Sequence, residues 1–211
     1  MTRRIIRFLP LLILAGCSTS VEKRVPRAAA EAMTGSPWTL TAVSSLTIEG
    51  NGKGVDETGA PFSVTSFQRV MNFKKGAWRQ QESRDGGPWH GTMLPAAERL
   101  HYPFGFILAA FASRAQLGNM RTEGNMEAVD LRVDGGVYTL FIDAKTHLPA
   151  KIASSTRGQT VETLFAKYVA VHGYQLPSEI IRNVDSSPVW ELSVTRQIAS
   201  ADAVALASGI E

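Results

Sequence analysis

Short segments of alternating or β-branched apolar residues recur along most of the chain, and glycine-containing turns separate them. A period of two predicts strands, because successive side chains of a strand point to opposite faces of a sheet. The predicted strands cover residues 38–49, 62–73, 77–84, 129–133, 137–142, 150–155, 160–171, 174–184 and 189–198. Turns as short as Asp134-Gly135-Gly136 join antiparallel neighbours, since glycine accepts a positive φ at little cost. We therefore expect a mainly β domain of the α+β class, built on one long antiparallel sheet.

The strand predicted for residues 38–49 is expected to end at a glycine-rich turn, residues 50–54. This turn superficially resembles a phosphate-binding loop, but it lacks the spacing of a P-loop and no predicted helix follows it. A flexible turn between two strands is the better interpretation.

A helical insertion interrupts the series of strands at residues 94–117, which are rich in Ala and Phe. Pro95 is suited to open one helix, and Pro103 to end it and start another. One face of the second helix carries four apolar side chains, those of Phe104, Ile107, Leu108 and Phe111. Phe106 and Ala110 lie on the opposite side, so this helix is apolar nearly all round and should be buried.

The first 17 residues have the order of a bacterial secretion signal, with a positive start and a short apolar stretch from Phe8 to Leu14. That stretch is too short to span a bilayer. It ends in Leu14-Ala15-Gly16-Cys17, which resembles a lipobox. The resemblance implies cleavage before Cys17 and acylation of this residue. The alternative is a buried cysteine at the end of a core helix.

Four regions follow from these patterns. Residues 1–16 are expected to be the signal peptide, and residues 17–35 to comprise the lipidated Cys17, a polar tether over 18–27 and a short helix over 28–33. Residues 36–198 are expected to form the sheet domain, and residues 199–211 a tail with a short helix over 199–207. Residue 18 is Ser rather than the Asp that commonly retains lipoproteins on the inner membrane of enteric bacteria. We therefore expect the protein on the outer membrane, facing the periplasm.

The charge balance argues against a nucleic-acid partner. The full chain has 22 Lys and Arg against 19 Asp and Glu, but three of the arginines lie in the predicted signal peptide. Removing them leaves equal numbers of basic and acidic residues, so there is no net attraction for a polyanion. The single cysteine excludes an intramolecular disulfide framework and a multi-cysteine zinc site.

Two phrases carry a family resemblance. One runs from Val137 to Ile152 and reads as an apolar strand, an Asp-x-x-Thr turn, Leu-Pro and the next strand. The other runs from Tyr168 to Ile180. Together they resemble the LolA/LolB-like family of periplasmic proteins. The resemblance implies a curved antiparallel half-barrel, with helices over its concave face and an apolar cavity for acyl chains. LolB-type members are themselves outer-membrane lipoproteins, which agrees with the lipobox.

A second resemblance links residues 46–84 to the non-catalytic N-terminal region of some periplasmic hydrolases with a metallo-β-lactamase fold. The catalytic His-x-His-x-Asp-His motif of those enzymes is absent here. The four histidines are not paired as in HxH or HExxH, and neither GxSxG nor SxxK occurs. We interpret these histidines as surface or turn residues, and we expect no enzymatic activity, no cofactor and no metal.

Apolar residues supply the candidate binding site, because ligand pockets are mostly apolar. The candidate cavity-lining residues are Phe104, Ile107, Leu108, Phe111, Trp38 and Trp78. The leading hypothesis is a lipid-anchored periplasmic binding module for an acyl chain or another apolar ligand, acting in envelope lipid or lipoprotein handling. The alternative is an accessory lipoprotein whose half-barrel is filled and whose surface meets an envelope protein partner.

Overall fold

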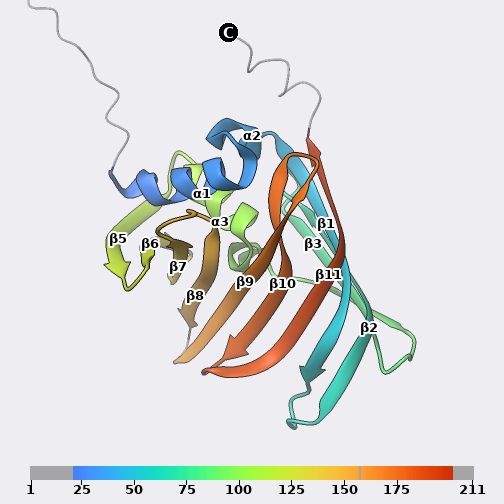
Figure 1. The fold of residues 1–211 in the computed structure, drawn as a ribbon. Helices are drawn as coiled ribbons and strands as arrows, with labels where there is room; N and C mark the ends of the chain where they lie inside the picture. The colour runs from blue at the N-terminus through green and yellow to red at the C-terminus, as the bar shows by residue number, and fades with distance from the viewer. Residues whose placement is uncertain (1–20, 157, 202–211) are drawn as a thin grey trace, which may run out of the picture.

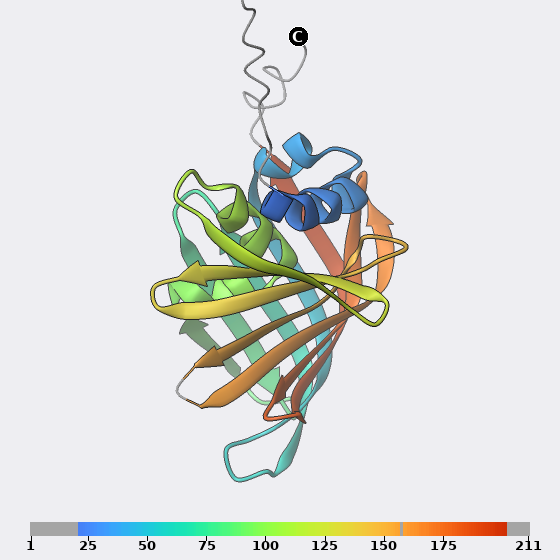
Figure 2. The same ribbon diagram turned by 90° about the vertical axis from the view of Figure 1, so that its left-hand side faces the viewer.

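The protein forms one antiparallel sheet of 11 strands, in the order β4-β3-β2-β1-β11-β10-β9-β8-β7-β6-β5. A computed structural model describes residues 21–156 and 158–201. The sheet is strongly curved without closing into a barrel, and the helices lie on its concave side (Figures 1 and 2). This architecture confirms the mainly β class and the half-barrel that the LolA/LolB-like resemblance implied.

The elements have the following bounds. The helical segments are η1 (Val21–Lys23), α1 (Arg24–Thr34), α2 (Pro37–Thr41), η2 (Ala96–His101) and α3 (Pro103–Phe111). The strands are β1 (Val43–Val55), β2 (Pro61–Asn72), β3 (Ala77–Arg84), β4 (Trp89–Met93), β5 (Gln116–Glu123), β6 (Met126–Val133), β7 (Gly136–Asp143), β8 (Pro149–Thr156), β9 (Gln159–Val171), β10 (Tyr174–Val184) and β11 (Ser187–Ala201).

The strand order explains why the helical insertion lies inside the half-barrel. Strands β1 to β4 and β5 to β11 pair with their sequence neighbours, while β1 pairs with β11. The two edges of the sheet are therefore β4 and β5, which directly flank the insertion in the sequence. Because the chain must pass from one edge to the other, η2 and α3 lie against the concave face, where their apolar side chains are buried.

The core fills the concave side between the sheet and the helices. Phe104, Phe106 and Ile107 of α3 are fully buried, as are Leu46 of β1 and Leu140 of β7. Packing is close where α3 follows η2: a Cβ atom at Gly105 would lie 2.0 Å from the Arg99 carbonyl oxygen. Only glycine allows this approach, so the turn between the two helices depends on position 105.

The strand predicted for residues 38–49 is wrong at its start, where the structure has α2. Ser36 is extended and Pro37 follows at the first helical position, and proline's φ is already suited to a helix there. β1 then begins at Val43 and continues through the glycine-rich stretch that was interpreted as a turn. A Cβ atom at Gly52 would lie 1.9 Å from the Glu191 carbonyl oxygen, so these glycines permit close strand pairing.

The N-terminal boundary also differs from the prediction. α1 begins at Arg24, inside the predicted tether, and Val25, Ala29 and Met33 are fully buried against the core. This spacing of four places them on one helical face, so α1 belongs to the folded domain rather than to a linker. The folded part therefore starts before residue 36. At the other end β11 continues through Ala201, so residues 199–201 are strand and the remainder of the predicted terminal helix lies outside the described residues.

Two edge strands, β4 and β5, were not predicted. All five residues of β4 are exposed, and β5 has no fully buried residue. The alternation of buried and exposed side chains that identifies a strand in a sequence is weak where a strand covers no core. Both are paired only on one side, as expected for the edges of an open sheet.

Candidate functional site

The structure divides the six predicted cavity-lining residues into three groups. Phe104, Ile107 and Trp78 are buried in the core. Leu108 and Phe111 are partly buried and pack against it. Trp38 is 73% exposed on α2, so it does not line an enclosed cavity with the others. The predicted lipidation site, Cys17, lies outside the described residues.

A pocket of about 500 Å³ lies where the end of the helical insertion meets the β6–β7 hairpin. We call it the insertion pocket. It is lined by Arg99, Ala109, Ala112, Arg114, Ala115, Gln116, Leu131, Arg132, Val133, Asp134, Gly135, Gly136 and Val137. Of the second predicted helix only Ala109 contributes to the wall, together with Ala112 just beyond it. None of the six predicted cavity-lining residues lines this pocket, which borders α3 only at its C-terminal end.

A second pocket, of about 280 Å³, contains a cluster of charges on the concave side. Glu98 of η2 accepts hydrogen bonds from Arg182 of β10, with 3.1 Å between Arg182 Nη2 and Glu98 Oε2. Arg69 of β2 lies 3.8 Å from the same carboxylate and donates to Gln80 Oε1 at 2.6 Å. Trp190 also lines this pocket, and its ring centroid lies 5.7 Å from the Arg69 guanidinium carbon. The cluster ties the insertion to two distant strands.

The pKa values in this cluster follow from burial and charge. Burial raises the pKa of Glu98, but Arg182 and Arg69 outweigh it and hold this pKa below its ordinary range. Burial lowers the pKa of Arg69, and Glu98 opposes that change. The Glu98 carboxylate is thus expected to be ionised at neutral pH, and with Arg69 and Arg182 it forms a largely buried ionic cluster.

His101, at the end of η2, was interpreted as a surface residue, and the structure shows that this is wrong. Its Nε2 lies 3.4 Å from Ser154 Oγ, and its ring packs edge-on against Tyr138. Burial, reinforced by Arg182, lowers the pKa of His101 to about 4. The imidazole is therefore neutral at pH 7.

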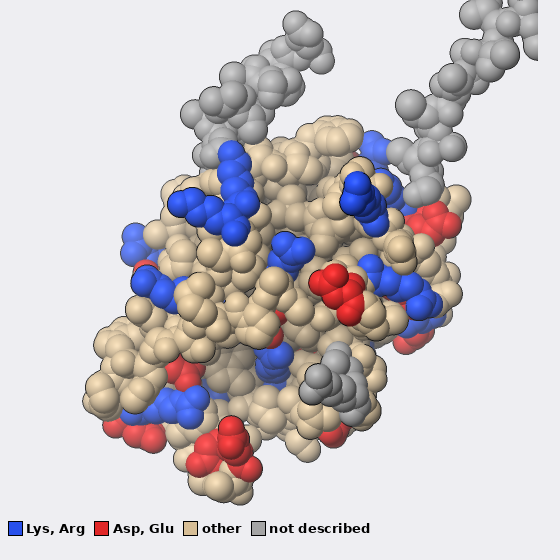
Figure 3. Space-filling model, turned by 180° about the vertical axis from the view of Figure 1, so that it is seen from behind, with Lys and Arg blue, Asp and Glu red and all other residues tan. Residues whose placement is uncertain are grey.

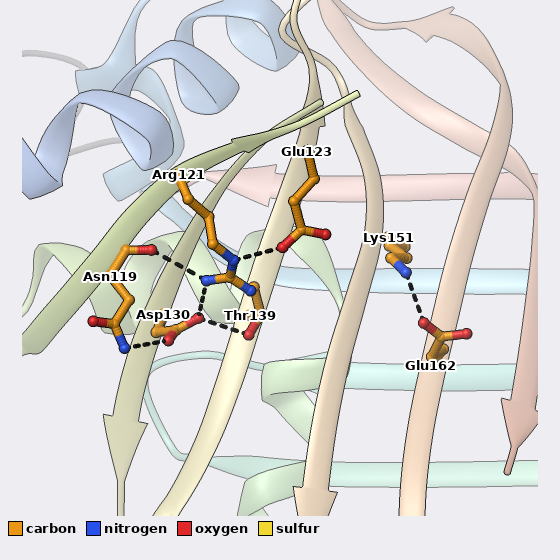
Figure 4. Close-up of polar contacts among 7 residues, drawn as sticks. All are labelled: Asn119, Arg121, Glu123, Asp130, Thr139, Lys151 and Glu162. Carbon is orange, nitrogen blue, oxygen red and sulfur yellow. Dashed lines mark hydrogen bonds and ion pairs between the residues drawn. The ribbon is translucent and has the colours of Figure 1, made fainter. Parts of the chain in front are cut away.

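A polar cluster on the outer face of the sheet centres on Asp130 of β6 (Figure 4). Its carboxylate accepts hydrogen bonds from Arg121 at 2.9 Å, Thr139 at 2.8 Å and Asn119 at 3.0 Å. Burial raises the pKa of Asp130, but these hydrogen bonds, with Arg121 first, outweigh it and lower the pKa overall. Because every carboxylate oxygen is already used, we interpret the cluster as a structural link between β5, β6 and β7.

The described residues include no group of three or more His, Cys, Asp or Glu side chains placed to hold a metal ion. Within residues 21–156 and 158–201, no helix is both long and apolar enough to cross a membrane. Basic and acidic side chains are interspersed over the face shown in Figure 3.

Sequence reasoning missed the charged residues that line these pockets. Three ionisable residues, Glu98, Arg99 and His101, lie within an insertion that is mostly apolar. Ionisable side chains in a segment expected to be buried are the one sequence feature that could have indicated a functional role. Their partner Arg182 is 84 residues away from Glu98, so no local pattern links the two.

No protein-family model matches this chain. The search of curated proteins also found no match. Twelve chains of solved structures do match. One is a LolA superfamily protein from Nitrosomonas europaea, which is 13% identical in sequence. The match covers 84% of this chain and 93% of that one, with a TM-score of 0.52. At this level of identity the likeness concerns the fold alone, and the fold is LolA-like.

Proposed function

We propose that a chain with this LolA-like fold acts as a lipid-anchored binding module of the cell envelope, on the outer membrane and facing the periplasm. Its ligand is an acyl chain or another apolar molecule, which it holds without covalent chemistry. The observation that carries the proposal is the way in which the helical insertion covers the concave face and leaves a pocket at its end.

α3 contains only apolar residues, Pro103 to Phe111, and no side chain of this helix takes part in a hydrogen bond or ion pair. It is held by apolar packing, and an apolar ligand bound beside its end would extend contacts of the same kind. Ala109 at its end borders the insertion pocket together with Leu131, Val133 and Val137. An apolar wall of this kind suits an acyl chain.

The test is binding of a neutral apolar probe, such as a fluorescent monoacylglycerol, by residues 18–211 expressed without the lipid. Native mass spectrometry of the same protein would reveal a co-purifying lipid. Ala112→Trp should fill the insertion pocket and weaken probe binding at least several-fold, because the exposed Ala112 lines it. Ala170→Trp is the matched control, since Ala170 is exposed on β9 and does not line this pocket. Equal binding by both variants would place the ligand elsewhere.

The second candidate is an accessory lipoprotein whose half-barrel is filled and whose outer surface meets an envelope protein. It is favoured by one observation: Phe104, Phe106 and Ile107 are fully buried, so α3 already occupies the centre of the concave side. Absence of probe binding, combined with no co-purifying lipid, would select this candidate over the first.

The anchor and the location are supported by the sequence pattern around Cys17. Cys17→Ala should abolish labelling with radioactive palmitate and block processing of the precursor. A variant that still incorporates palmitate would contradict the anchor. Fractionation of inner and outer membranes would then test the location separately.

A further inference from the structure

We propose that the insertion pocket selects an amphiphile with an anionic head group, a carboxylate or phosphate attached to an apolar chain. This inference rests on the proposed function and specifies the ligand class for the same site. It follows from the charges that line the pocket and from the partners that those charges lack.

Three arginines from three different segments line the insertion pocket. Arg99 belongs to η2, Arg114 to the connection between α3 and β5, and Arg132 to the end of β6. Asp134 is the only acidic residue in the lining, so the wall carries a formal charge of +2. Guanidinium groups are donors that match the geometry of carboxylate and phosphate.

Within residues 21–156 and 158–201 no hydrogen bond or ion pair joins these three guanidinium groups to another side chain; Arg114 and Arg132 are exposed to water, whereas Arg99 is partly buried. Arg69, Arg121 and Arg182, by contrast, all contact acidic side chains. Arg99 Nε is moreover buried without a hydrogen-bond partner among the described residues. A buried donor left unsatisfied is unfavourable, and an anion in the pocket would supply the missing acceptor.

The same lining contains an apolar part, formed by Ala109, Ala115, Leu131, Val133 and Val137. A small inorganic anion would leave these side chains unused, whereas an acyl chain would cover them. The combination of unpaired arginines and aliphatic side chains in one pocket is therefore suited to an amphiphile rather than to a free anion.

The experiment compares three probes by titration calorimetry on residues 18–211: decanoate, decanol and inorganic phosphate. Decanoate should bind about tenfold or more tightly than decanol, because a hydrogen bond to a charged group contributes that much. Phosphate, which lacks the chain, should bind much more weakly than decanoate. Added salt should reduce the affinity for decanoate but not for decanol.

Three variants assign the charge effect to the pocket. Arg99→Gln and Arg114→Gln should each lower the affinity for decanoate several-fold and leave that for decanol unchanged. Asp134→Asn should act in the opposite direction and strengthen decanoate binding, since it removes the one negative charge of the lining. Asn is also tolerated at this position, where φ is 49°. Arg79→Gln is the control, because Arg79 is exposed on β3 and does not line the pocket.

The outcomes separate this inference from the proposed function. Equal affinities for decanoate and decanol, unchanged by the arginine variants, would overturn the proposed selectivity for an anionic head group. The proposed function, binding of an apolar ligand, would then still hold. Phosphate binding as tight as decanoate binding, with the same dependence on Arg99 and Arg114, would show a site for a free anion and would overturn the amphiphile. No binding of any probe would refute both.

Discussion

Arg182 of β10 donates two hydrogen bonds to the carboxylate of Glu98 in η2, one of them 3.1 Å between Nη2 and Oε2. The contact joins the helical insertion to the sheet across 84 residues of sequence. The insertion is thus held by charge at η2 and by apolar packing alone at α3. Ala109, near the end of the apolar part, borders the insertion pocket.

Glu98→Gln should lower the free energy of unfolding by about 3 kcal/mol, because removing one partner leaves buried charges uncompensated. The Glu98 side chain is 14% exposed and that of Arg182 is 25% exposed, so water compensates little. Glu191→Gln is the matched control, since it breaks the exposed pair with Lys53 and should cost less than about 1 kcal/mol. Urea unfolding measures both. Equal effects of the two changes would contradict a stabilising role for the buried pair.

Stability should depend on pH through His101. Its pKa is about 4 when folded and near 6.5 when unfolded, so the folded state resists protonation. This contribution is fully present above pH 6.5 and is lost as the pH falls from 6.5 towards 4, by up to roughly 3 kcal/mol. Glu98 adds to the loss only below its ordinary pKa of 4.5, as the pH falls towards its lowered folded pKa.

His101→Gln should flatten the fall in unfolding free energy between pH 6.5 and pH 4.5, whereas His90→Gln, at an exposed position of β4, should leave it unchanged. Urea melts at several pH values provide the measurement. A slope that is the same in both variants would assign the pH dependence to other groups.

Two positions of α3, Phe104 and Leu108, should respond differently to truncation. Phe104→Ala should cost about 3–5 kcal/mol, because this fully buried ring leaves a cavity. Leu108→Ala should cost about 2 kcal/mol or less, since Leu108 is only partly buried. Thermal and urea unfolding compare them. If Leu108→Ala were as damaging as Phe104→Ala and the parent bound no fluorescent fatty acid, the half-barrel would be a filled core.

The end of the molecule that carries α1 and α2 should face the membrane if Cys17 is acylated. Val21 lies only four positions after Cys17 in the sequence, a reach of at most about 14 Å. Trp38 on α2 is 73% exposed at this end, and its ring is suited to the lipid–water interface. We therefore expect bromine-labelled phospholipids to quench Trp38 fluorescence when the lipidated protein is bound to vesicles.

Trp89 provides the internal control, because it is 54% exposed but lies on the edge strand β4, three strands away from β1, the strand that follows α2 in the chain. Trp38→Phe should remove most of the quenching, and Trp89→Phe should not. The reverse result would show that another face of the domain meets the membrane.

The local sequence pattern was sufficient to predict much of the secondary structure. The hairpin at Asp134-Gly135 and the apolar helix after Pro103 depend on residues adjacent in sequence, so period and turn chemistry predicted both. The same logic failed at α2, where proline at the first helical position prevailed over the strand pattern. It failed at β4 as well, because an exposed edge strand has no buried face to mark it.

By itself, the sequence determined the alternation of strands and turns and the buried character of α3; its lipobox-like pattern predicts acylation of Cys17. Only the tertiary structure decided that the insertion crosses the half-barrel from β4 to β5, that Glu98 meets Arg182, and that Arg99, Arg114 and Arg132 line one pocket. The physical reason is the separation along the sequence over which each kind of interaction acts. Periodicity and turn preference act between neighbours in the chain, whereas ionic pairs and pockets depend on which distant segments the curved sheet brings together.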